Sequence, residues 1–324
     1  MKVLLTGAFG NVGRSTLTEL VSKGYEVRAF DLDTPENREY AKMYENDPDV
    51  VMFWGNLCSP EDALRACEGI DVVIHVAAII PPLADKKPEL AKAVNVGGTQ
   101  NILAAIKAQP QPPRLIFTSS ISVYGDRVQN PFIRVTDPLN PNDDDDYART
   151  KVTAENLIQD SGITSAIFRL TYIVSPDKLQ MDPLMFHMPL KTSIEICHTR
   201  DVGLALTNAV ENEQIWGGTY HIAGGEKCRT TYNEYIKHMM ELFGLGSNLL
   251  PENAFSTGKF HCGFMDTERS QTLLKYQQTT LEDYYAEVAQ KVGYKKWGNW
   301  AIRWFIRRYL LSKSQFYKNS RNPP

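Results

Sequence analysis

Short apolar runs alternate with amphipathic stretches along roughly the first 120 residues of the chain. Five apolar runs predict buried strands, at residues 1–6, 25–30, 50–54, 72–76 and 114–118. Helical spacing of the apolar positions between them predicts helices, at residues 14–23, 60–68 and 90–107. Strands that alternate with helices indicate a parallel sheet covered on both faces. We therefore expect an α/β fold with a doubly wound parallel sheet.

Three glycines, Gly7, Gly10 and Gly13, mark the turn between the first strand and the first helix. Glycine permits a tight turn, lets backbone amides approach a pyrophosphate, and allows close packing of helix on strand. A glycine-rich turn can also exist without a ligand. The strand before it, the helix after it and an acidic residue at the end of the second strand favour a dinucleotide-binding Rossmann unit.

Asp31 is the acidic residue at the end of the second strand. A carboxylate there can accept hydrogen bonds from the ribose hydroxyls of adenosine and would repel a 2′-phosphate. Asp31 therefore favours NAD over NADP, although an ordinary surface aspartate is the alternative. Arg28 and Arg38 are nearby cations, so NADP is not excluded.

Tyr147 and Lys151 stand four residues apart, so on a helix their side chains share one face. An unperturbed tyrosine has a pKa of about 10, and acid/base work near pH 7 needs a neighbouring positive charge. Many such pairs lie on solvated helix faces, so the pair indicates catalysis only together with the motifs upstream of it. His75 lies inside an apolar strand, where we expect a packed or hydrogen-bonded histidine rather than a base.

Five motifs occur in order along the chain, at Thr6–Gly13, His75–Ala78, Asn95–Thr99, Ser119–Gly125 and Tyr147–Lys151. Together they resemble the extended short-chain dehydrogenase/reductases, and more narrowly the NAD-dependent epimerase/dehydratase group. The resemblance runs from residue 1 to about residue 225. It includes His198–Val202 and Thr219–Gly224, which are similar to two later signatures of the family.

The resemblance implies NAD as the cofactor and no metal. It implies that Tyr147 is the general acid/base, that Lys151 holds the nicotinamide ribose and lowers the pKa of the tyrosine, and that Ser120 binds the substrate oxygen. The cofactor-binding residues that it implies are Gly7, Phe9, Gly10, Asn11, Val12, Gly13, Asp31, Asn56, Leu57, Val76, Ala77, Ala78, Asn95, Thr118, Tyr147 and Lys151. The substrate-binding residues are Ser120 and Tyr172.

Departures from the family pattern bear on the substrate. Ile121 and Ser122 stand where sugar-nucleotide dehydratases carry an Asp-Glu pair, and Tyr172 stands where epimerases carry a phosphate-binding asparagine. The segment between Pro176 and His198 has only about 20 residues, and Lys178 and Lys191 are its only lysines or arginines. We therefore expect a smaller or less charged alcohol or ketone rather than a sugar nucleotide.

Two further departures concern the cofactor and the catalytic helix. Asn56 stands where the family usually has an aspartate that meets the adenine amino group, and an amide can still accept a hydrogen bond there. The acidic run Asp143–Asp146 precedes Tyr147. It is either a solvated loop that caps the helix, or a charge that discourages anionic substrates and raises the pKa of Tyr147.

Composition is that of an ordinary globular protein, with 43% hydrophobic and 23% charged residues. A net charge of -3 gives no reason to expect a nucleic-acid partner. Five scattered cysteines indicate reduced thiols rather than disulfides or a metal site. The N-terminus does not read as a signal peptide, and no apolar run approaches the length of a membrane span. We expect a cytoplasmic protein.

The second half of the sequence is less regular. Helices are expected at residues 231–245 and 281–292, and residues 181–188 suit either a hydrophobic substrate wall or packing in the core or a lid. We divide the chain into a dinucleotide-binding domain at 1–165, a substrate-binding region at 166–290 interleaved with the last sheet strands, and a tail at 291–324.

The tail, residues 291–324, has nine lysines and arginines and no acid, so the rest of the chain carries about −12. Five aromatic residues are interleaved with these cations: Trp297, Trp300, Trp304, Phe305 and Tyr309. The aromatic face can pack on the domain or on a second subunit. It can also lie in a membrane interface or bind an acidic partner.

The sequence thus predicts an NAD-dependent oxidoreductase that transfers a hydride reversibly at a secondary alcohol or ketone. A sugar or nucleotide-sugar epimerase that recycles its NAD uses the same Ser-Tyr-Lys set and is the first alternative. A dinucleotide-sensing protein without turnover is the second. By analogy with the family we expect a homodimer formed through two helices that flank the sheet.

Overall fold

A computed structural model describes residues 1–179 and 181–321 of the chain. Its centre is a seven-stranded sheet in the order β10-β7-β5-β4-β1-β2-β3, with every neighbouring pair parallel. The strands are β1 (Lys2–Thr6), β2 (Glu26–Asp31), β3 (Val50–Trp54), β4 (Val72–His75), β5 (Arg114–Ser120), β7 (Ser165–Leu170) and β10 (Thr219–Ile222). The predicted doubly wound Rossmann sheet is confirmed.

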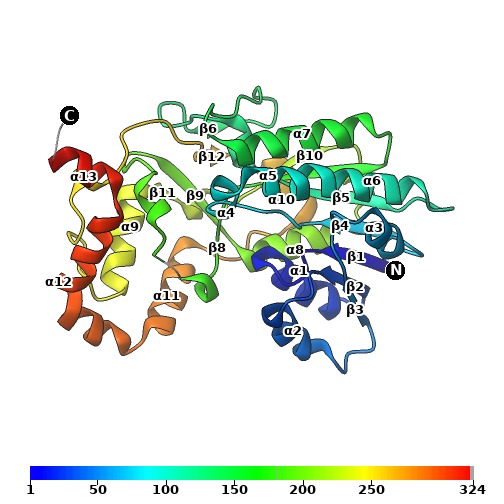
Figure 1. The fold of residues 1–324 in the computed structure, drawn as a ribbon, viewed down its shortest axis with the longest axis horizontal. Helices are drawn as coiled ribbons and strands as arrows, with labels where there is room; N and C mark the ends of the chain where they lie inside the picture. The colour runs from blue at the N-terminus through cyan, green and yellow to red at the C-terminus, as the bar shows by residue number, and fades with distance from the viewer. Residues whose placement is uncertain (180, 322–324) are drawn as a thin grey trace.

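Helices cover both faces of this sheet (Figure 1). On one face α1 (Asn11–Ser22) packs against α8 (Thr199–Ala209), with α2 (Pro35–Ala41) and α10 (Glu268–Leu274) beside them. On the other face lie α3 (Pro60–Ala66), α5 (Pro88–Lys92), α6 (Thr99–Lys107) and α7 (Asp146–Asp160). The central strands β1, β4, β5 and β7 are almost wholly buried, as the apolar runs predicted, whereas only Val50 of the edge strand β3 is buried.

The strand order reverses next to β1, whose two neighbours are β2 and β4. The connections leave β1 and β4 toward opposite faces of the sheet, and a crevice therefore opens at the carboxyl ends of these strands. The glycine turn follows β1 and the small residues Ala77 and Ala78 follow β4. Topology thus brings the two segments to the same edge.

Two boundaries differ from the sequence expectation. Helix α1 begins at Asn11, three residues earlier than expected, because Gly10 already serves as its N-cap. The expected helix at 90–107 is divided into α5, a π-helical turn at Ala93–Gly98, and α6. Propensity patterns do not distinguish a π-helical turn from the α-helix on either side of it.

A second, smaller region extends from the carboxyl edge of the sheet. It contains a three-stranded sheet of β8 (Tyr172–Val174), β9 (Ser193–His198) and β11 (Arg229–Thr231), and a two-stranded sheet of β6 (Phe132–Ile133) and β12 (Phe264–Met265). Its helices are α9 (Tyr232–Leu242), α11 (Leu281–Val292), α12 (Lys295–Lys313) and α13 (Gln315–Arg321). They enclose a hydrophobic core of their own.

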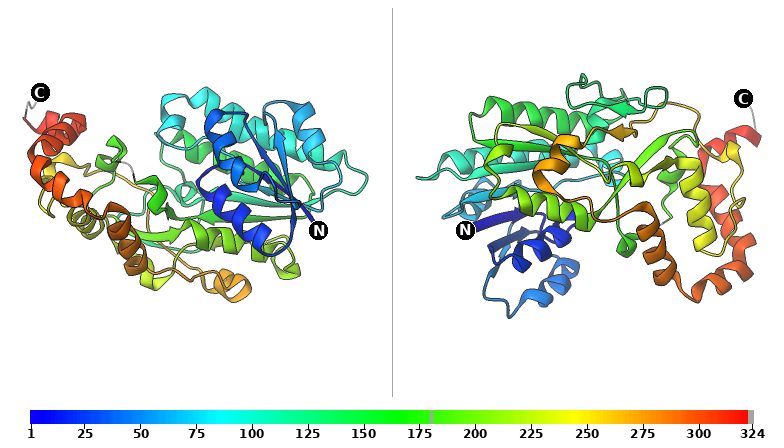
Figure 2. Two further views of the ribbon diagram at one scale, coloured as in Figure 1. Left: turned by 90° about the horizontal axis from the view of Figure 1, so that it is seen from below. Right: turned by 180° about the vertical axis from the view of Figure 1, so that it is seen from behind.

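Helices α12 and α13 lie at one end of the molecule, away from the N-terminus (Figure 2). Only Leu310 and Leu311 of α12 are buried. Of the alternatives for the aromatic face of the tail, packing on the domain is wrong, because Trp297, Trp300 and Trp304 are each more than half exposed.

Candidate active site

In the glycine turn after β1, two glycines lie so close to neighbouring backbone atoms that no side chain would fit there. Gly7 has a φ of +68°, and a Cβ there would lie 2.8 Å from the Cα of Ala77. A Cβ on Gly13 would lie 2.0 Å from the carbonyl oxygen of Gly7. The N–H of Gly10 donates to the same carbonyl at 3.0 Å. The turn is therefore closed tightly onto both α1 and the segment after β4.

Helix α1 begins without a side-chain cap. Gly10 at the N-cap has no side chain to accept a hydrogen bond from the first amides, and the first turn has no acidic residue. The first amides of α1, at Asn11, Val12 and Gly13, thus remain available at the positive end of the helix dipole. This arrangement fits the pyrophosphate of a dinucleotide.

Asp31, at the end of β2, is held beside this turn. One carboxylate oxygen accepts from the N–H of Phe9 at 2.9 Å, and the other accepts from the N–H of Leu32 at 2.8 Å. Burial raises the pKa of Asp31, and these two backbone hydrogen bonds act in the opposite direction. The fixed carboxylate retains lone pairs for the hydroxyls of a ribose.

Arg28 and Arg38, the cations near Asp31 in the sequence, have other partners. Arg28 donates to three carbonyls at the end of α3, those of Arg65, Ala66 and Glu68. Arg38 donates to Asp33 at 2.8 Å and lies over the ring of Trp54. Neither side chain is positioned as a free partner for a 2′-phosphate.

The loop after β3 carries the two residues expected near an adenine. Asn56 is exposed, and its side-chain oxygen accepts from the N–H of Cys58 at 2.9 Å. Leu57 is buried against Gly98, where a Cβ would approach to 3.1 Å. Asn56 therefore uses one acceptor lone pair locally and keeps its amide donors.

The segment after β4, which includes Val76, Ala77 and Ala78, is braced by Asn95. The side chain of Asn95 accepts from the N–H of Ile79 at 2.7 Å and donates to its carbonyl at 2.9 Å. It also donates to the hydroxyl of Thr150 on α7 at 3.0 Å. Asn95, in the π-helical turn, thus ties the β4 loop to the helix that carries Tyr147 and Lys151.

The Ser-Tyr-Lys set lies at the carboxyl end of β5. Ser120 is the last residue of this strand, and α7 carries Tyr147 and Lys151 in its first two turns. Lys151 is 3% exposed, donates from Nζ to the carbonyl of Thr118 at 2.8 Å, and lies 5.9 Å from the ring centroid of Tyr147. Burial lowers the pKa of Lys151 to about 8, and Glu155 acts in the opposite direction.

The pKa of Tyr147 is raised, mainly by burial. The negative charge of Asp145 also raises it, whereas a hydrogen bond with the Ser120 hydroxyl lowers it. Asp145 is the N-cap of α7, with its carboxylate accepting from the N–H of Ala148 at 2.8 Å. Asp145 therefore both caps the helix and opposes ionisation of Tyr147.

Sequence reasoning missed Ser122 as part of this arrangement. Its hydroxyl and its backbone N–H both donate to the oxygen of Ser120, at 3.0 and 3.2 Å. With its lone pairs so engaged, Ser120 is left to donate its own proton to Tyr147 or to a ligand oxygen. The spacing Ser120-x-Ser122 in a turn after a strand was the available signal.

His75 is a packed histidine, as expected. It is 1% exposed, and its two ring nitrogens lie 2.7 Å from the hydroxyl of Thr6 and 3.1 Å from that of Thr99. Burial, with a smaller effect of Lys151, lowers its pKa to about 3. It is therefore neutral and links β4, where it lies, to β1 and α6 through these two hydroxyls.

Of the two residues expected to bind a substrate, Ser120 ends β5 of the main sheet, whereas Tyr172 lies in the smaller region. Tyr172 begins β8 and contacts Tyr235 edge to face, with ring centroids 6.1 Å apart. Phe186 and Met188 are buried in the hydrophobic core there, so these two side chains of the segment 181–188 serve packing.

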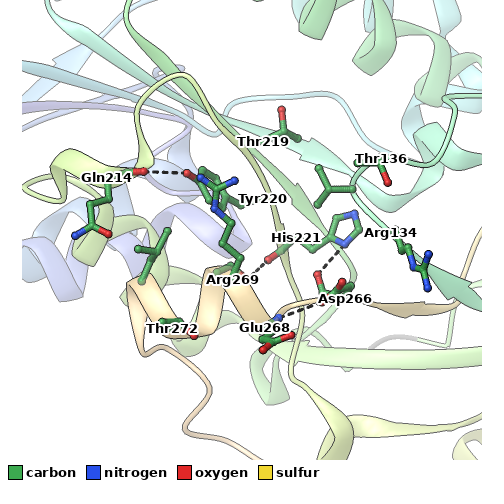
Figure 3. A pocket seen from close by; sticks show the side chains of 13 residues that line it. Arg134, Thr136, Gln214, Thr219, Tyr220, His221, Asp266, Glu268, Arg269 and Thr272 are labelled. Atoms are coloured by element: carbon green, nitrogen blue, oxygen red, sulfur yellow. Dashed lines mark hydrogen bonds between the residues drawn. The ribbon is translucent and has the colours of Figure 1, made fainter.

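A hollow of about 630 Å³ lies elsewhere, against β10 and α10 (Figure 3). Arg134, Tyr220, His221 and Arg269 are among its lining residues, and the Ser-Tyr-Lys set is not. Among residues 1–179 and 181–321, no cluster of three or more His, Cys, Asp or Glu side chains could hold a metal ion. All five cysteines are free thiols.

The sequence matches the model of the NAD dependent epimerase/dehydratase family over residues 3–223. The chain therefore belongs to this family of NAD-dependent enzymes. The matched residues span the strands of the Rossmann sheet and include Ser120, Tyr147 and Lys151. The resemblance inferred from the motifs is confirmed.

Among curated proteins, a 3 beta-hydroxysteroid dehydrogenase/Delta 5-->4-isomerase of Mycobacterium tuberculosis is 33% identical over 167 residues, which are 48% of this chain and 42% of that protein. A decarboxylating sterol-4-alpha-carboxylate 3-dehydrogenase of Bos taurus is 28% identical over 212 residues, which are 64% of this chain and 56% of that protein. The matches thus span about half the length of these curated relatives.

Solved structures show the same fold. A dTDP-glucose 4,6-dehydratase of Streptomyces venezuelae with bound NAD has a TM-score of 0.76 and 21% identity, covering 90% of this chain and 96% of that one. A UDP-glucuronic acid 4-epimerase of Bacillus cereus, solved with UDP-glucuronic acid and NAD, has a TM-score of 0.73 and 20% identity, covering 90% and 99%. At such identities the likeness concerns the fold alone.

Proposed function

We propose that this chain is an NAD-dependent oxidoreductase that interconverts a secondary alcohol and a ketone. The observation that carries the proposal is the convergence of Ser120, Tyr147 and Lys151 at the carboxyl end of β5. Topology places the glycine turn at the same edge of the sheet. NAD, when bound, supplies the hydride acceptor or donor at that edge.

In this proposal Tyr147 exchanges a proton with the substrate oxygen. Removal of hydride from a carbinol requires loss of the O–H proton, which a phenolate can accept. Ser120 donates a hydrogen bond to the same oxygen, and Ser122 fixes the orientation of the Ser120 hydroxyl. Lys151 is anchored to the carbonyl of Thr118 and places its ammonium beside Tyr147 and the ribose of the cofactor.

The cofactor assignment divides among four segments. The turn Gly7–Gly13 holds the pyrophosphate, and Asp31 accepts from the ribose hydroxyls. Asn56 and Leu57 meet the adenine. Val76, Ala77 and Ala78, braced by Asn95, line the nicotinamide side. The commitments of Arg28 and Arg38 to other partners support NAD rather than NADP.

For the substrate we propose an apolar secondary alcohol, with a sterol-like ring system as the first choice. Two relatives carry steroid or sterol dehydrogenase names. Ile80 and Leu83, in the segment after β4, are 56% and 40% exposed, and α4 (Leu83–Lys86) contacts α7. The segment before His198 has two lysines and no arginine, which gives a diphosphate few partners.

The test is a screen of 3-hydroxysteroids, simple secondary alcohols and sugar nucleotides with NAD, followed through the nicotinamide absorbance. Tyr147→Phe should lower kcat/KM by about 10²–10⁴-fold. Tyr294→Phe is the matched control, because Tyr294 is 83% exposed on the far region and should leave the rate unchanged. Equal activity of Tyr147→Phe and the wild type on a true substrate would overturn the assignment.

The same screen separates the alternatives. An epimerase returns its hydride, so a sugar nucleotide would be converted to its epimer, detected by chromatography, without accumulation of NADH. A sensor would bind NAD in calorimetry and turn over none of the compounds. Net NADH formation with an alcohol is the outcome expected here.

A further inference from the structure

Helix α12 carries an exposed aromatic face. Trp297, Trp300 and Trp304 follow each other at helical spacing and are 69%, 57% and 59% exposed. Phe305 and Tyr309 extend the apolar surface along the helix and are 67% and 60% exposed. Large apolar side chains scattered singly are common on protein surfaces, whereas a continuous set on one helix marks an interaction site.

Other side chains of α12 fix the helix to the body of the protein. Leu310 and Leu311 are buried in the hydrophobic core of the smaller region. The side chain of Asn299 donates to the carbonyl of Phe243 at 3.0 Å, and that of Arg307 donates to the carbonyl of Leu249 at 2.8 Å. The tryptophans are therefore held outward by a helix with a defined orientation.

Positive charge surrounds the aromatic face. Lys296, Arg303 and Arg308 each lie over a tryptophan ring of α12, at 5.4, 5.3 and 5.8 Å from the ring centroid. A hollow of about 490 Å³ between α12 and α13 is lined by four cations, Arg307, Arg308, Lys318 and Arg321, and by no acidic side chain. The sequence has no Asp or Glu from residue 291 onward. A partner that fits this surface therefore offers both an apolar layer and negative charge.

We propose that α12 docks on the surface of an anionic lipid bilayer. Its tryptophans would lie at the boundary between headgroups and acyl chains, and its cations against the headgroups. Among the described helices none is long and apolar enough to cross a membrane, and α12 itself carries six lysines and arginines in 19 residues. The helix therefore lies along the bilayer surface rather than through it.

A second copy of the chain is a poorer occupant of this face. A two-fold interface brings the same patch of both subunits together. It would set the cations of one α12 against those of the other with no acid in either tail. An anionic bilayer instead attracts each cation near its surface, by about fivefold in partition coefficient per residue. The proposal holds whether or not the substrate is the one proposed above.

The first experiment is flotation of the full-length protein with lipid vesicles. Vesicles with about 30% phosphatidylserine should carry the protein upward at low salt, and vesicles of phosphatidylcholine alone should carry far less. Raising the salt to about 0.5 M should release it, since screening then acts within roughly 5 Å. Three of the five tryptophans lie on α12, so their fluorescence should shift to the blue on binding.

Two triple variants then separate the contributions. The combination Trp297→Ala, Trp300→Ala and Trp304→Ala should abolish flotation. The combination Lys296→Gln, Arg303→Gln and Arg308→Gln should weaken partitioning to anionic vesicles by about 100-fold. A control with Lys92→Gln, Lys107→Gln and Lys259→Gln removes three exposed cations outside the tail and should bind like the wild type.

Circular dichroism and thermal melting should show that all variants remain folded. Vesicle binding by the tryptophan variant at the level of the wild type would overturn the proposal. It would also fail if the wild type ignored anionic vesicles, and conversion of a dimer to a monomer by the tryptophan variant in sedimentation would assign the face to a second copy instead.

Discussion

Asp145→Asn is the most informative single change at the proposed active site. The negative charge of Asp145 raises the pKa of Tyr147, while its carboxylate caps α7 through the N–H of Ala148. Asparagine is as good an N-cap as aspartate, so the substitution removes the charge and keeps the cap. The pKa of Tyr147 should fall, and the pH dependence of alcohol oxidation should move to lower pH.

The size of this effect follows from Coulomb's law. Asp145 precedes Tyr147 by two residues, and we take their charged groups to be about 7 Å apart. For a pair near a protein surface the effective dielectric constant lies between about 20 and the value of about 80 for bulk water. The interaction is then about 0.6–2.4 kcal/mol, which corresponds to about 0.4–1.7 pH units.

The assay is kcat/KM for oxidation of the best alcohol across pH. Oxidation needs the phenolate, so the rate rises with pH until Tyr147 is ionised. At a pH on the rising limb, Asp145→Asn should increase kcat/KM by about three- to fiftyfold and leave the plateau in place. Asp144→Asn is the control, because Asp144 is exposed and does not cap α7. A profile unchanged by Asp145→Asn, or a shift to higher pH, would refute the reasoning.

Three further predictions follow from the contacts around the site. Asp31→Ala should reduce the preference for NAD over NADP, measured as the ratio of the two kcat/KM values; an unchanged ratio would contradict the ribose role. Gly13→Ala should abolish NAD binding in calorimetry, because the new Cβ would lie 2.0 Å from the carbonyl oxygen of Gly7. Arg169→Met should lower the free energy of unfolding in urea by about 3–5 kcal/mol, because it strands the buried carboxylate of Glu155, and adding Glu155→Leu should restore most of the loss.

The Rossmann half of the fold follows from the sequence because each of its signals is local. The strands have short apolar runs, the turn has glycines at fixed spacing, and α1 begins directly after Gly10, its N-cap. Helix α11 occupies Leu281–Val292, as predicted, since Thr280 and Asp283 form a capping box at its start. Local chemistry of this kind is readable without tertiary contacts.

The rest depended on partners distant in sequence. Asn95 was expected near the cofactor, but its bond to Thr150 joins positions 55 residues apart. Whether Tyr172 faced a substrate or other tyrosines depended on Tyr235, 63 residues further along. The spacing of the aromatic residues of α12 fits a buried face as well as an exposed one. Which face points outward depended on the packing of Leu310 and Leu311 against the smaller region.

Burial acts on the two ionisable members of the site in opposite directions. It raises the pKa of Tyr147 and lowers that of Lys151 to about 8, so each is driven toward its neutral form. The Ser120 hydroxyl favours the phenolate, and Asp145 opposes it. His261 lies 3.4 Å from the carboxylate of Asp145, so a histidine of the smaller region touches the charge that holds Tyr147 protonated. A positively charged ligand at this edge of the sheet would favour the phenolate and lower the pKa of Tyr147, against the effects of burial and of Asp145.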